Sequence, residues 1–417
     1  MSSKKPASPA KPHGLGTRAV VTYDDGKKLN SPLSAPLLQT VTFQAASSKE
    51  LGDMFKAATP SVYTRFGHPT LAAAGEKIAA LEGAEAGLVF SSGMAAISTS
   101  LLAVLRPGDH VVAQREIFGQ TFTFLDRTLR EFGVVTDFVP AHDAAGFERA
   151  LRHNTRLVYI ETPSNPLLRV ADIAEKARLA HSVNALLFVD GTFASPVLQN
   201  PLFLGADLVL HSATKFLAGH SDVLCGAAAG SRVLLARIRE MQVQLGGVMD
   251  PHAAWLLLRG IKTLEVRVMR QCATALRIAE LLAARDEVSA VLYPWLESSP
   301  GSDIARRQMR AGGGVISFEM AGGLHAARAF VDALEIIPIA TSLGGVESLI
   351  EIPYDLDFSE EELGDAAQHT GIAPGLIRLS VGIETPEDLL ADIERGLQAA
   401  KRAASTSSPN KQHATAR

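Results

Sequence analysis

Cysteine is scarce in this chain of 417 residues, which contains only Cys225 and Cys272. Two cysteines cannot build a disulfide framework or a CxxC metal pair, so we expect both thiols to be reduced, in a cytoplasmic protein. The chain has no run of 18 apolar residues, and its first 12 residues are rich in Lys, Ser and Pro and contain no apolar stretch. We therefore expect neither a membrane span nor a signal peptide.

Strong charge is also lacking, because the formal net charge is −4. This gives no electrostatic reason to expect binding to nucleic acid or to an anionic membrane surface. The motifs GxGxxG, GxxxxGK[ST] and HExxH are absent, and Gly312-Gly313-Gly314 does not have their spacing. These absences disfavour a dehydrogenase, a kinase and a zinc protease, and we expect no metal site.

Short apolar runs alternate with helical segments in the first half of the chain. This alternation predicts an α/β fold with a mainly parallel sheet covered on both faces. Ligands of such sheets lie beyond the carboxyl ends of the strands. The expected strands are residues 87–90, 110–113, 134–139, 157–160, 186–189 and 208–210, and the expected helices between them are 95–105, 121–132 and 173–181.

The same patterns predict how the chain is divided. Residues 1–13 and 405–417 are expected to be disordered tails, and 14–62 is a weakly patterned arm expected to contact a neighbouring subunit. Residues 63–259 form the expected large domain, and 260–404 a smaller α/β domain. Apolar positions from Ile261 to Leu282 step by three or four residues, which places Cys272 in a helix core, and Gly260 is expected to break this helix from the segment before it.

Three segments carry side chains suited to chemistry. Ser91-Ser92-Gly93-Met94 lies between an expected strand and an expected helix, where backbone N–H groups can bind a phosphate. Asp190 ends one expected strand, and His211-Ser212-Ala213-Thr214-Lys215 follows another. Each alone has an ordinary explanation: a helix cap, an Asx-turn and a surface lysine. Together they supply the anion site, the ring-nitrogen partner and the amine that pyridoxal phosphate requires.

The chain resembles the Cys/Met-metabolism pyridoxal-phosphate enzymes from about residue 14 to residue 400. This group includes cystathionine γ-synthase, cystathionine γ-lyase, methionine γ-lyase and the O-acylhomoserine sulfhydrylases. The resemblance implies a fold-type-I architecture and a homotetramer built from two active-site dimers. The motifs that carry it are Tyr63-Thr64-Arg65, Ser92-Gly93-Met94, Glu161-Thr162-Pro163-Ser164-Asn165-Pro166, His211-Ser212-Ala213-Thr214-Lys215 and Ser342-Leu343-Gly344-Gly345-Val346-Glu347-Ser348-Leu349.

The resemblance also implies roles for particular residues. Lys215 would be the Schiff-base lysine and the base that moves substrate protons, and Asp190 would pair with the pyridine nitrogen. Arg378 would bind the substrate carboxylate, with Asn165 and the Ser342 backbone orienting cofactor and substrate. The expected phosphate ligands are Gly93, Met94, Ser212 and Thr214, together with Tyr63 and Arg65 from the neighbouring subunit.

Several positions depart from the family pattern. Phe118 replaces the tyrosine usual at the ring-stacking position, so it can stack on the cofactor but cannot donate a proton to a leaving group. His68 and Gly191 stand where asparagine is usual, and Gln120 stands where methionine γ-lyases typically have cysteine. Residues 353–362 replace a Ser-Met-Thr-His-like segment with an acidic run, whose ordinary explanation is a solvated surface.

The motifs leave the reaction open between two outcomes. Loss of the Cγ substituent can release 2-oxobutanoate and ammonia, or a thiol can add and complete a γ-replacement. The Glu347 carboxylate would repel an O-succinyl group and favour a cationic distal end, as in cystathionine or canavanine, so the expectation is γ-elimination. The alternatives are γ-replacement, a β-lyase, and a non-catalytic cofactor-binding protein.

Overall fold

The computed structural model describes residues 13–21, 33–56, 61–356 and 372–406. The predicted tails, 1–13 and 405–417, lie almost wholly outside the described residues. The acidic run at 353–362 is described only as far as residue 356, where the 3-10 turn η3 (Pro353–Asp355) occurs.

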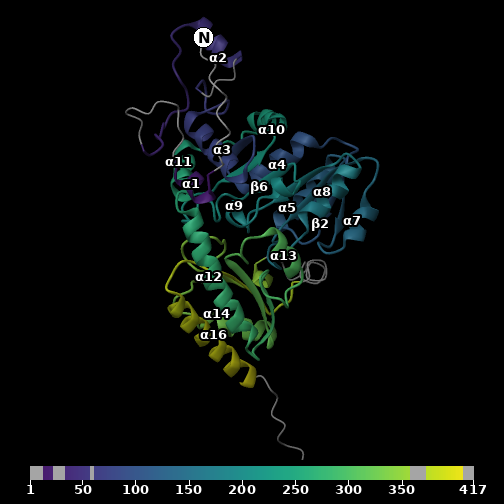
Figure 1. Cartoon of the computed structure of the whole chain (residues 1–417), viewed down its shortest axis with the longest axis vertical. Coiled ribbons are helices and arrows are strands. Elements are labelled where there is room, and N and C mark those ends of the chain that lie inside the picture. Colours follow the sequence, from purple (N-terminus) through teal and green to yellow (C-terminus); the bar gives the residue numbers. More distant parts are fainter. Residues whose placement is uncertain (1–12, 22–32, 57–60, 357–371, 407–417) are drawn as a thin grey trace, which may run out of the picture.

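The larger of two sheets in the described residues has seven strands and occupies the upper part of the molecule in Figure 1. Its strand order is β1-β7-β6-β5-β4-β2-β3, and every strand except β7 runs in the same direction. The predicted α/β fold with a mainly parallel sheet is therefore confirmed. The strands are β1 (Ala86–Phe90), β2 (His110–Gln114), β3 (Val135–Val139), β4 (Thr155–Glu161), β5 (Leu186–Asp190), β6 (Leu208–His211) and β7 (Gly226–Gly230).

Helices cover both faces of this sheet because its strands are apolar on both sides. Val111 packs with α4 (Gly93–Val104) and α10 (Arg232–Leu245), whereas Val112 packs with α7 (Ala144–Ala150) and α8 (Ile173–Ser182) on the opposite face.

The helix predicted at 121–132 is not uniform. It begins earlier, as α5 (Gly119–Thr123), and passes through a π-helical turn η1 (Phe124–Thr128) into α6 (Leu129–Glu131). Two further short elements, α9 (Ser195–Leu198) and η2 (Pro201–Leu204), follow β5.

Strand β7 was missed by the pattern of apolar runs because it consists only of alanine and glycine. Its small side chains allow α3 (Pro69–Glu82) and α4 to pack closely over it. A Cβ atom added to Gly226 would lie 2.0 Å from the carbonyl oxygen of Ser92, the residue that caps α4. The absence of large side chains in β7 is therefore what brings the start of α4 against the sheet.

The smaller sheet lies below the first in Figure 1 and has the order β10-β11-β9-β8, with antiparallel neighbours throughout. Its strands are β8 (Val288–Leu292), β9 (Val315–Met320), β10 (Leu349–Glu351) and β11 (Leu376–Ser380). Three helices, α12 (Leu264–Ala283), α14 (Gly323–Asp332) and α16 (Pro386–Thr406), share a core with it, and α13 (Ser302–Gln308) lies nearer the large sheet. The predicted boundary between residues 259 and 260 stays a prediction.

The junction between the two sheets corrects the role predicted for Gly260. Helix α11 (Pro251–Ile261) runs through Gly260, and the break falls at Lys262 and Thr263, before α12 begins. Gly260 is instead a site of close approach, because a Cβ atom there would lie 2.1 Å from the Ala218 carbonyl oxygen. Cys272 is buried in the helix core, as predicted.

Replacing Gly260 by alanine should therefore destabilise the protein by about 2 kcal/mol, although alanine is the better helix former. Gly52→Ala is the matched control, because Gly52 lies in α2 (Ser48–Lys56) and a Cβ atom there meets nothing within 4 Å. The midpoint of denaturant unfolding should fall for Gly260→Ala and hold or rise for Gly52→Ala. Equal midpoints would contradict the close contact.

Candidate active site

The carboxyl ends of three neighbouring parallel strands carry buried polar side chains. Glu161 ends β4, Asp190 ends β5 and His211 ends β6, and β4–β5 pairing sets Glu161 opposite Asp190. Lys215 follows in a turn, with its backbone N–H donating to the Ser212 carbonyl at 3.1 Å. The predicted sequence segments after β5 and β6 therefore meet at one edge of the sheet.

The predicted phosphate site joins the start of α4 to the turn after β6. Ser92 is the N-cap of α4, and its hydroxyl accepts a hydrogen bond from the Ala95 N–H at 3.0 Å. A Cβ atom on Gly93 would lie 2.8 Å from the Ser212 Cβ, so only glycine permits this approach. The arrangement sets a helix N-terminus beside a serine, which suits an anion.

Two other predicted phosphate ligands have neighbours within the chain. The Met94 sulfur accepts a weak hydrogen bond from the Thr121 hydroxyl at 3.8 Å. The Thr214 hydroxyl donates to the Cys225 carbonyl at 3.0 Å and accepts from the Cys225 N–H at 2.8 Å. Because its proton is used there, a phosphate contact through the Thr214 hydroxyl requires that the bond to the Cys225 carbonyl be given up.

Asp190 is buried, and one of its oxygens is held by the residue two positions later. Oδ1 accepts hydrogen bonds from the Thr192 N–H at 2.9 Å and from the Thr192 hydroxyl at 2.5 Å. The ordinary Asx-turn explanation for Asp190 is therefore correct as local structure. The Thr192 hydroxyl also accepts from the Ser212 N–H at 2.8 Å, which ties Asp190 to the turn that carries Lys215. The sequence pattern gave no sign of this role for Thr192.

Burial is the main influence on the protonation of Asp190. It raises the pKa of this carboxyl, against the lowering effect of the Thr192 bonds and of His211. A cationic ring nitrogen placed beside Asp190 would favour the ionised carboxylate and reverse this shift. A buried carboxyl that ionises when a cation lies beside it fits the partner role predicted from the sequence.

Lys215 is partly buried, and its amine donates a hydrogen bond to the Ser342 hydroxyl at 2.8 Å. Burial, and then the Arg378 cation, lower the pKa of Lys215 to about 8, although Glu351 opposes the shift. Ser342 has φ of 83°, a strained conformation for a residue with a side chain. The lowered pKa leaves a substantial fraction of neutral amine at neutral pH, which a nucleophile or a base requires.

We expect the rate at which an aldehyde reagent attaches to Lys215 to increase with pH and to level off above pH ~8, because only the neutral amine reacts. The rate can be followed by borohydride trapping and mass spectrometry of the Lys215 peptide. The denatured protein is the control and should level off near pH ~10.4. The same plateau in the folded protein would contradict the lowered pKa.

Arg378 on β11 is buried and contacts several groups of this site. Its guanidinium donates to the Asn165 side-chain oxygen at 2.9 Å and to the Ser342 carbonyl at 2.8 Å, and it pairs with Glu351 at 2.8 Å. Arg378 thus brings together the predicted residues Asn165 and Ser342, which lie far apart in the sequence. Glu351 was missed by sequence reasoning, and the β10–β11 register that pairs it with Arg378 is a tertiary feature.

Three predicted residues make their contacts with other parts of the chain. Arg65 donates to the Val243 carbonyl at 3.2 Å on α10, and Tyr63 stacks against the same arginine. Among the described residues, no recorded hydrogen bond or ring contact joins either one to Lys215 or Asp190. Glu347 is exposed, and its carboxylate accepts from the Ser221 hydroxyl at 3.3 Å.

The structure explains why His68 and Gly191 can stand where the family usually has asparagine. His68 is the N-cap of α3, and its Nδ1 accepts a hydrogen bond from the Thr70 N–H at 3.2 Å, which is the capping role that asparagine often fills. Burial lowers the pKa of His68, which favours the neutral ring that this acceptor role needs. A Cβ atom on Gly191 would lie 3.1 Å from the His211 ring, so glycine relieves a tight contact there.

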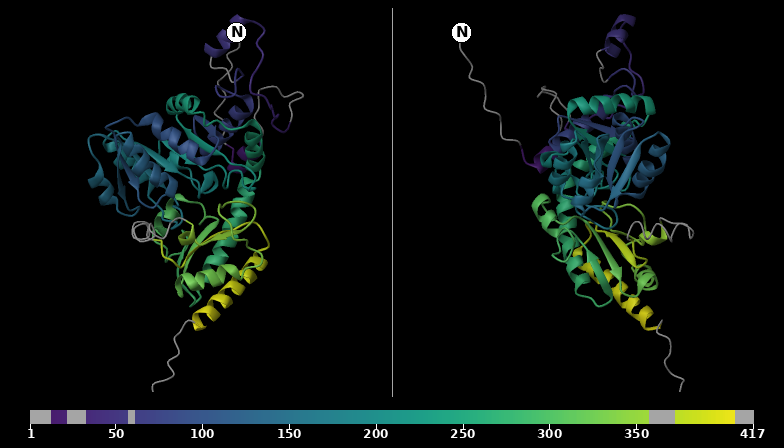
Figure 2. Two further views of the ribbon diagram at one scale, coloured as in Figure 1. Left: turned by 180° about the vertical axis from the view of Figure 1, so that it is seen from behind. Right: turned by 90° about the vertical axis from the view of Figure 1, so that its right-hand side faces the viewer.

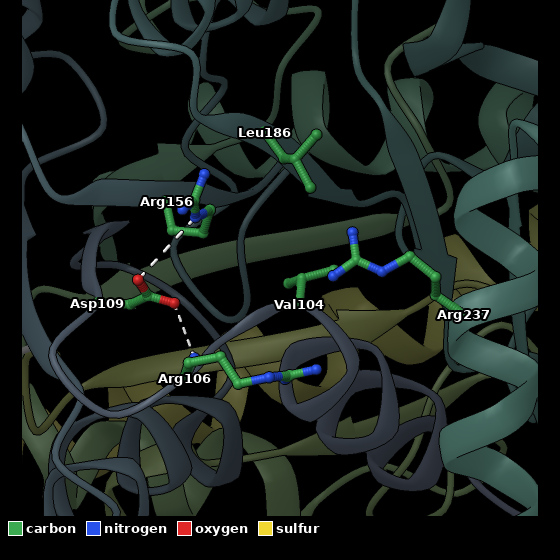
Figure 3. A pocket seen from close by; sticks show the side chains of 6 residues that line it. All are labelled: Val104, Arg106, Asp109, Arg156, Leu186 and Arg237. Atoms are coloured by element: carbon green, nitrogen blue, oxygen red, sulfur yellow. Dashed lines mark hydrogen bonds and ion pairs between the residues drawn. The ribbon is translucent and has the colours of Figure 1, made fainter.

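A hollow at the opposite edge of the large sheet does not belong to this site (Figure 3). Its arginines have structural partners. Arg106 donates to the Leu102 and Leu105 carbonyls at the end of α4, and Arg237 donates to the Ala103 carbonyl. These two arginines cap the carboxyl end of α4, which explains the basic lining of the hollow without a ligand.

Neither a metal-binding cluster nor a membrane-spanning helix occurs among the described residues. No group of three or more His, Cys, Asp or Glu side chains there is arranged to hold a metal ion. No helix in the same part of the chain has the length and apolar character to cross a bilayer.

Comparisons with known proteins agree on one family. The profile of the Cys/Met metabolism PLP-dependent enzymes matches residues 16–398. The L-methionine gamma-lyase of Fusobacterium nucleatum subsp. nucleatum is 41% identical over 395 residues, covering 93% of this chain and 99% of that protein. The cystathionine beta-lyase of Lactococcus lactis subsp. cremoris is 43% identical over 374 residues, covering 89% and 95%. The crystal structure of cystathionine gamma synthase from Xanthomonas oryzae pv. oryzae in complex with cystathionine has a TM-score of 0.88 and 38% identity, covering 94% and 100%.

Proposed function

Because the chain belongs to the Cys/Met metabolism PLP-dependent enzymes, we propose that it catalyses γ-elimination on an amino acid of the homoserine or methionine type, with γ-replacement as the alternative. The observation that carries the proposal is the position of the Lys215 amine. It donates to the Ser342 hydroxyl at 2.8 Å, and the Arg378 guanidinium donates to the carbonyl of the same serine at 2.8 Å. A base and a carboxylate-binding group in this arrangement can act on one α-amino acid.

The residues of the site fit pyridoxal phosphate. Gly93 and Ser212 approach each other closely at the N-terminus of α4, where the phosphate would be held. Asp190 would face the ring nitrogen, and Phe118, a residue that is 39% exposed, would stack on the cofactor ring. Bound there, the cofactor would withdraw electrons from the substrate and make its Cα proton acidic.

The chain itself would bind the substrate and move its protons. Arg378 would hold the substrate carboxylate through its guanidinium, with Asn165 and the Ser342 carbonyl fixing the orientation of the fork. The Lys215 amine would accept the proton from Cα and move protons at Cβ, after which the Cγ substituent leaves. The pKa of about 8 suits a group that both accepts and returns protons near neutral pH.

The distal group of the substrate is the basis for choosing elimination. Glu347 is exposed beside Ser221 and would attract a cationic distal end, such as the amine of cystathionine or the guanidinium group of canavanine. Phe118 cannot protonate a leaving group, so we propose a substituent that leaves without much help. Because a γ-lyase without a proton donor at position 118 would need another source for that proton, γ-replacement stays the alternative. The likeness to the Xanthomonas oryzae cystathionine gamma synthase also supports this alternative.

We also propose that the protein is a cytoplasmic homotetramer in which the 14–62 arm contacts a neighbouring subunit. Helix α1 (Leu15–Val20) packs on its own chain, but α2 buries none of its residues and projects from the top of the molecule (Figure 2). Leu51 and Phe55 on α2 are both exposed and would supply apolar contacts to a second chain. Tyr63 and Arg65 would then reach the phosphate site of that neighbouring chain.

The decisive experiment is product analysis of the purified, cofactor-loaded protein. The substrates are cystathionine, methionine and canavanine, each with and without an added thiol. Release of 2-oxobutanoate or homoserine is expected, whereas a thioether amino acid that carries the group of the added thiol at Cγ, formed only when thiol is present, would indicate γ-replacement. Pyruvate would indicate β-elimination, the reaction that the name of the Lactococcus relative indicates. A change in cofactor absorption without any product would support a non-catalytic protein.

A further inference from the structure

Two loops that carry site residues are joined by one buried carboxylate. The first loop leads from β2 into α5 and ends at Phe118, which is the N-cap of α5. The second follows β4 and contains Asn165. Glu161, the last residue of β4, is 2% exposed and lies between them.

Each oxygen of Glu161 accepts one backbone hydrogen bond. Oε2 accepts from the Phe118 N–H at 2.8 Å, and Oε1 accepts from the Asn165 N–H at 2.7 Å. Gln114, at the end of β2, adds a parallel link, because its side-chain oxygen accepts from the Glu161 N–H at 3.4 Å and its amide donates to the Glu116 carbonyl at 2.8 Å. The ends of β2 and β4 are thus cross-linked by two buried side chains.

The two loops serve different parts of the proposed site. Phe118 is the residue proposed to stack on the cofactor ring, and Asn165 accepts a hydrogen bond from Arg378 at 2.9 Å. Any change in the spacing of the two loops would therefore move the Phe118 ring relative to the Arg378 guanidinium that is proposed to bind the substrate carboxylate. A displacement of about 1 Å in such a site is enough to cost about 10²-fold in rate.

We propose that Glu161 is a positioning residue that sets the spacing between the loop that ends at Phe118 and the loop that contains Asn165, the hydrogen-bond partner of Arg378. This inference rests on the proposed function, because it uses the roles assigned there to Phe118, Asn165 and Arg378. Both Glu161 oxygens are engaged by backbone N–H groups, so Glu161 acts through Phe118 and Asn165.

The chemistry of the side chain explains why both oxygens are needed. A carboxylate has two acceptor oxygens, whereas glutamine has one and would turn an NH2 group toward a backbone N–H. Aspartate keeps both acceptors but is one methylene shorter, so it cannot reach both loops without moving one. Burial and Asp190 raise the pKa of Glu161, and the Phe118 and Asn165 N–H groups oppose that rise, since they favour the ionised form.

Glu161→Gln tests the inference, with Glu116→Gln as the matched control. Glu116 lies in the same loop, but its carboxylate accepts the Ala141 N–H at 2.9 Å and does not join the Phe118 loop to the Asn165 loop, and the substitution keeps the backbone carbonyl that Gln114 contacts. For Glu161→Gln we expect the KM of the best substrate and the dissociation constant of the cofactor each to increase by about tenfold or more, with an altered visible circular dichroism of the bound cofactor. Glu116→Gln should match the wild type in all three measurements.

The outcomes separate the two proposals. Folded Glu161→Gln with wild-type KM, cofactor affinity and dichroism would overturn the positioning role, even if its melting temperature were lower. If the amide variant does not fold, Glu161→Asp is measured in the same way. If the wild type forms no product from any substrate, the proposed function fails, whereas cofactor affinity and dichroism still report on Glu161.

Discussion

Replacing Lys215 by alanine should abolish covalent attachment of the cofactor and reduce turnover by about 10³-fold or more, while the fold stays intact. The variant removes the amine and its 2.8 Å hydrogen bond to Ser342, but no packed apolar side chain. The loss is measured as kcat with the best substrate of the panel. Borohydride reduction followed by mass spectrometry reports covalent attachment, and far-ultraviolet circular dichroism reports the fold.

Lys401→Ala is the control for this experiment. Lys401 is 76% exposed on α16 and pairs with Glu287, so its removal should leave turnover and cofactor attachment unchanged. If Lys215→Ala turned over at the wild-type rate, both the assignment of the base and the location of the active site would be wrong.

Replacing Arg378 by lysine should lower kcat/KM by about 10²-fold, mainly by raising KM. The guanidinium fork reaches Asn165, Ser342 and Glu351 at 2.8–2.9 Å, whereas a lysine ammonium is a single point charge that cannot bind a carboxylate through two parallel hydrogen bonds. Lysine retains the positive charge, so Glu351 is not left as an unpaired buried carboxylate. The expected loss therefore reflects binding geometry more than stability.

Arg328→Lys makes the same chemical change at an exposed position, where Arg328 pairs with Asp355, and should leave kcat/KM unchanged. A second comparison uses a substrate whose α-carboxylate is converted to an amide. The wild type and Arg378→Lys should differ much less with this substrate than with the free acid. An equal loss with both substrates would show that Arg378 does not bind the carboxylate.

The strands that carry the site were predictable because buried parallel strands are short apolar runs with polar residues at their ends. Asp190 and the segment around Lys215 follow such runs, and the structure brings them together at one sheet edge. Strand β7 was not predictable in this way, because it is composed of Ala and Gly and is recognised only by the helices that pack on it. Gly260 was misjudged for a related reason, since its role depends on the distant Ala218 carbonyl.

The sequence by itself determined the family, the cofactor and the α/β architecture, because these depend on motifs and on the period of apolar residues along the chain. Only the tertiary structure decided which groups touch. Arg378 meets Asn165 across 213 positions of sequence, and Glu351 pairs with Arg378 through strand register. Glu161 was visible in its motif, but a lone carboxylate carries no sign of its partners. Its position between Phe118 and Asn165 follows from the meeting of two loops, which a local pattern does not encode.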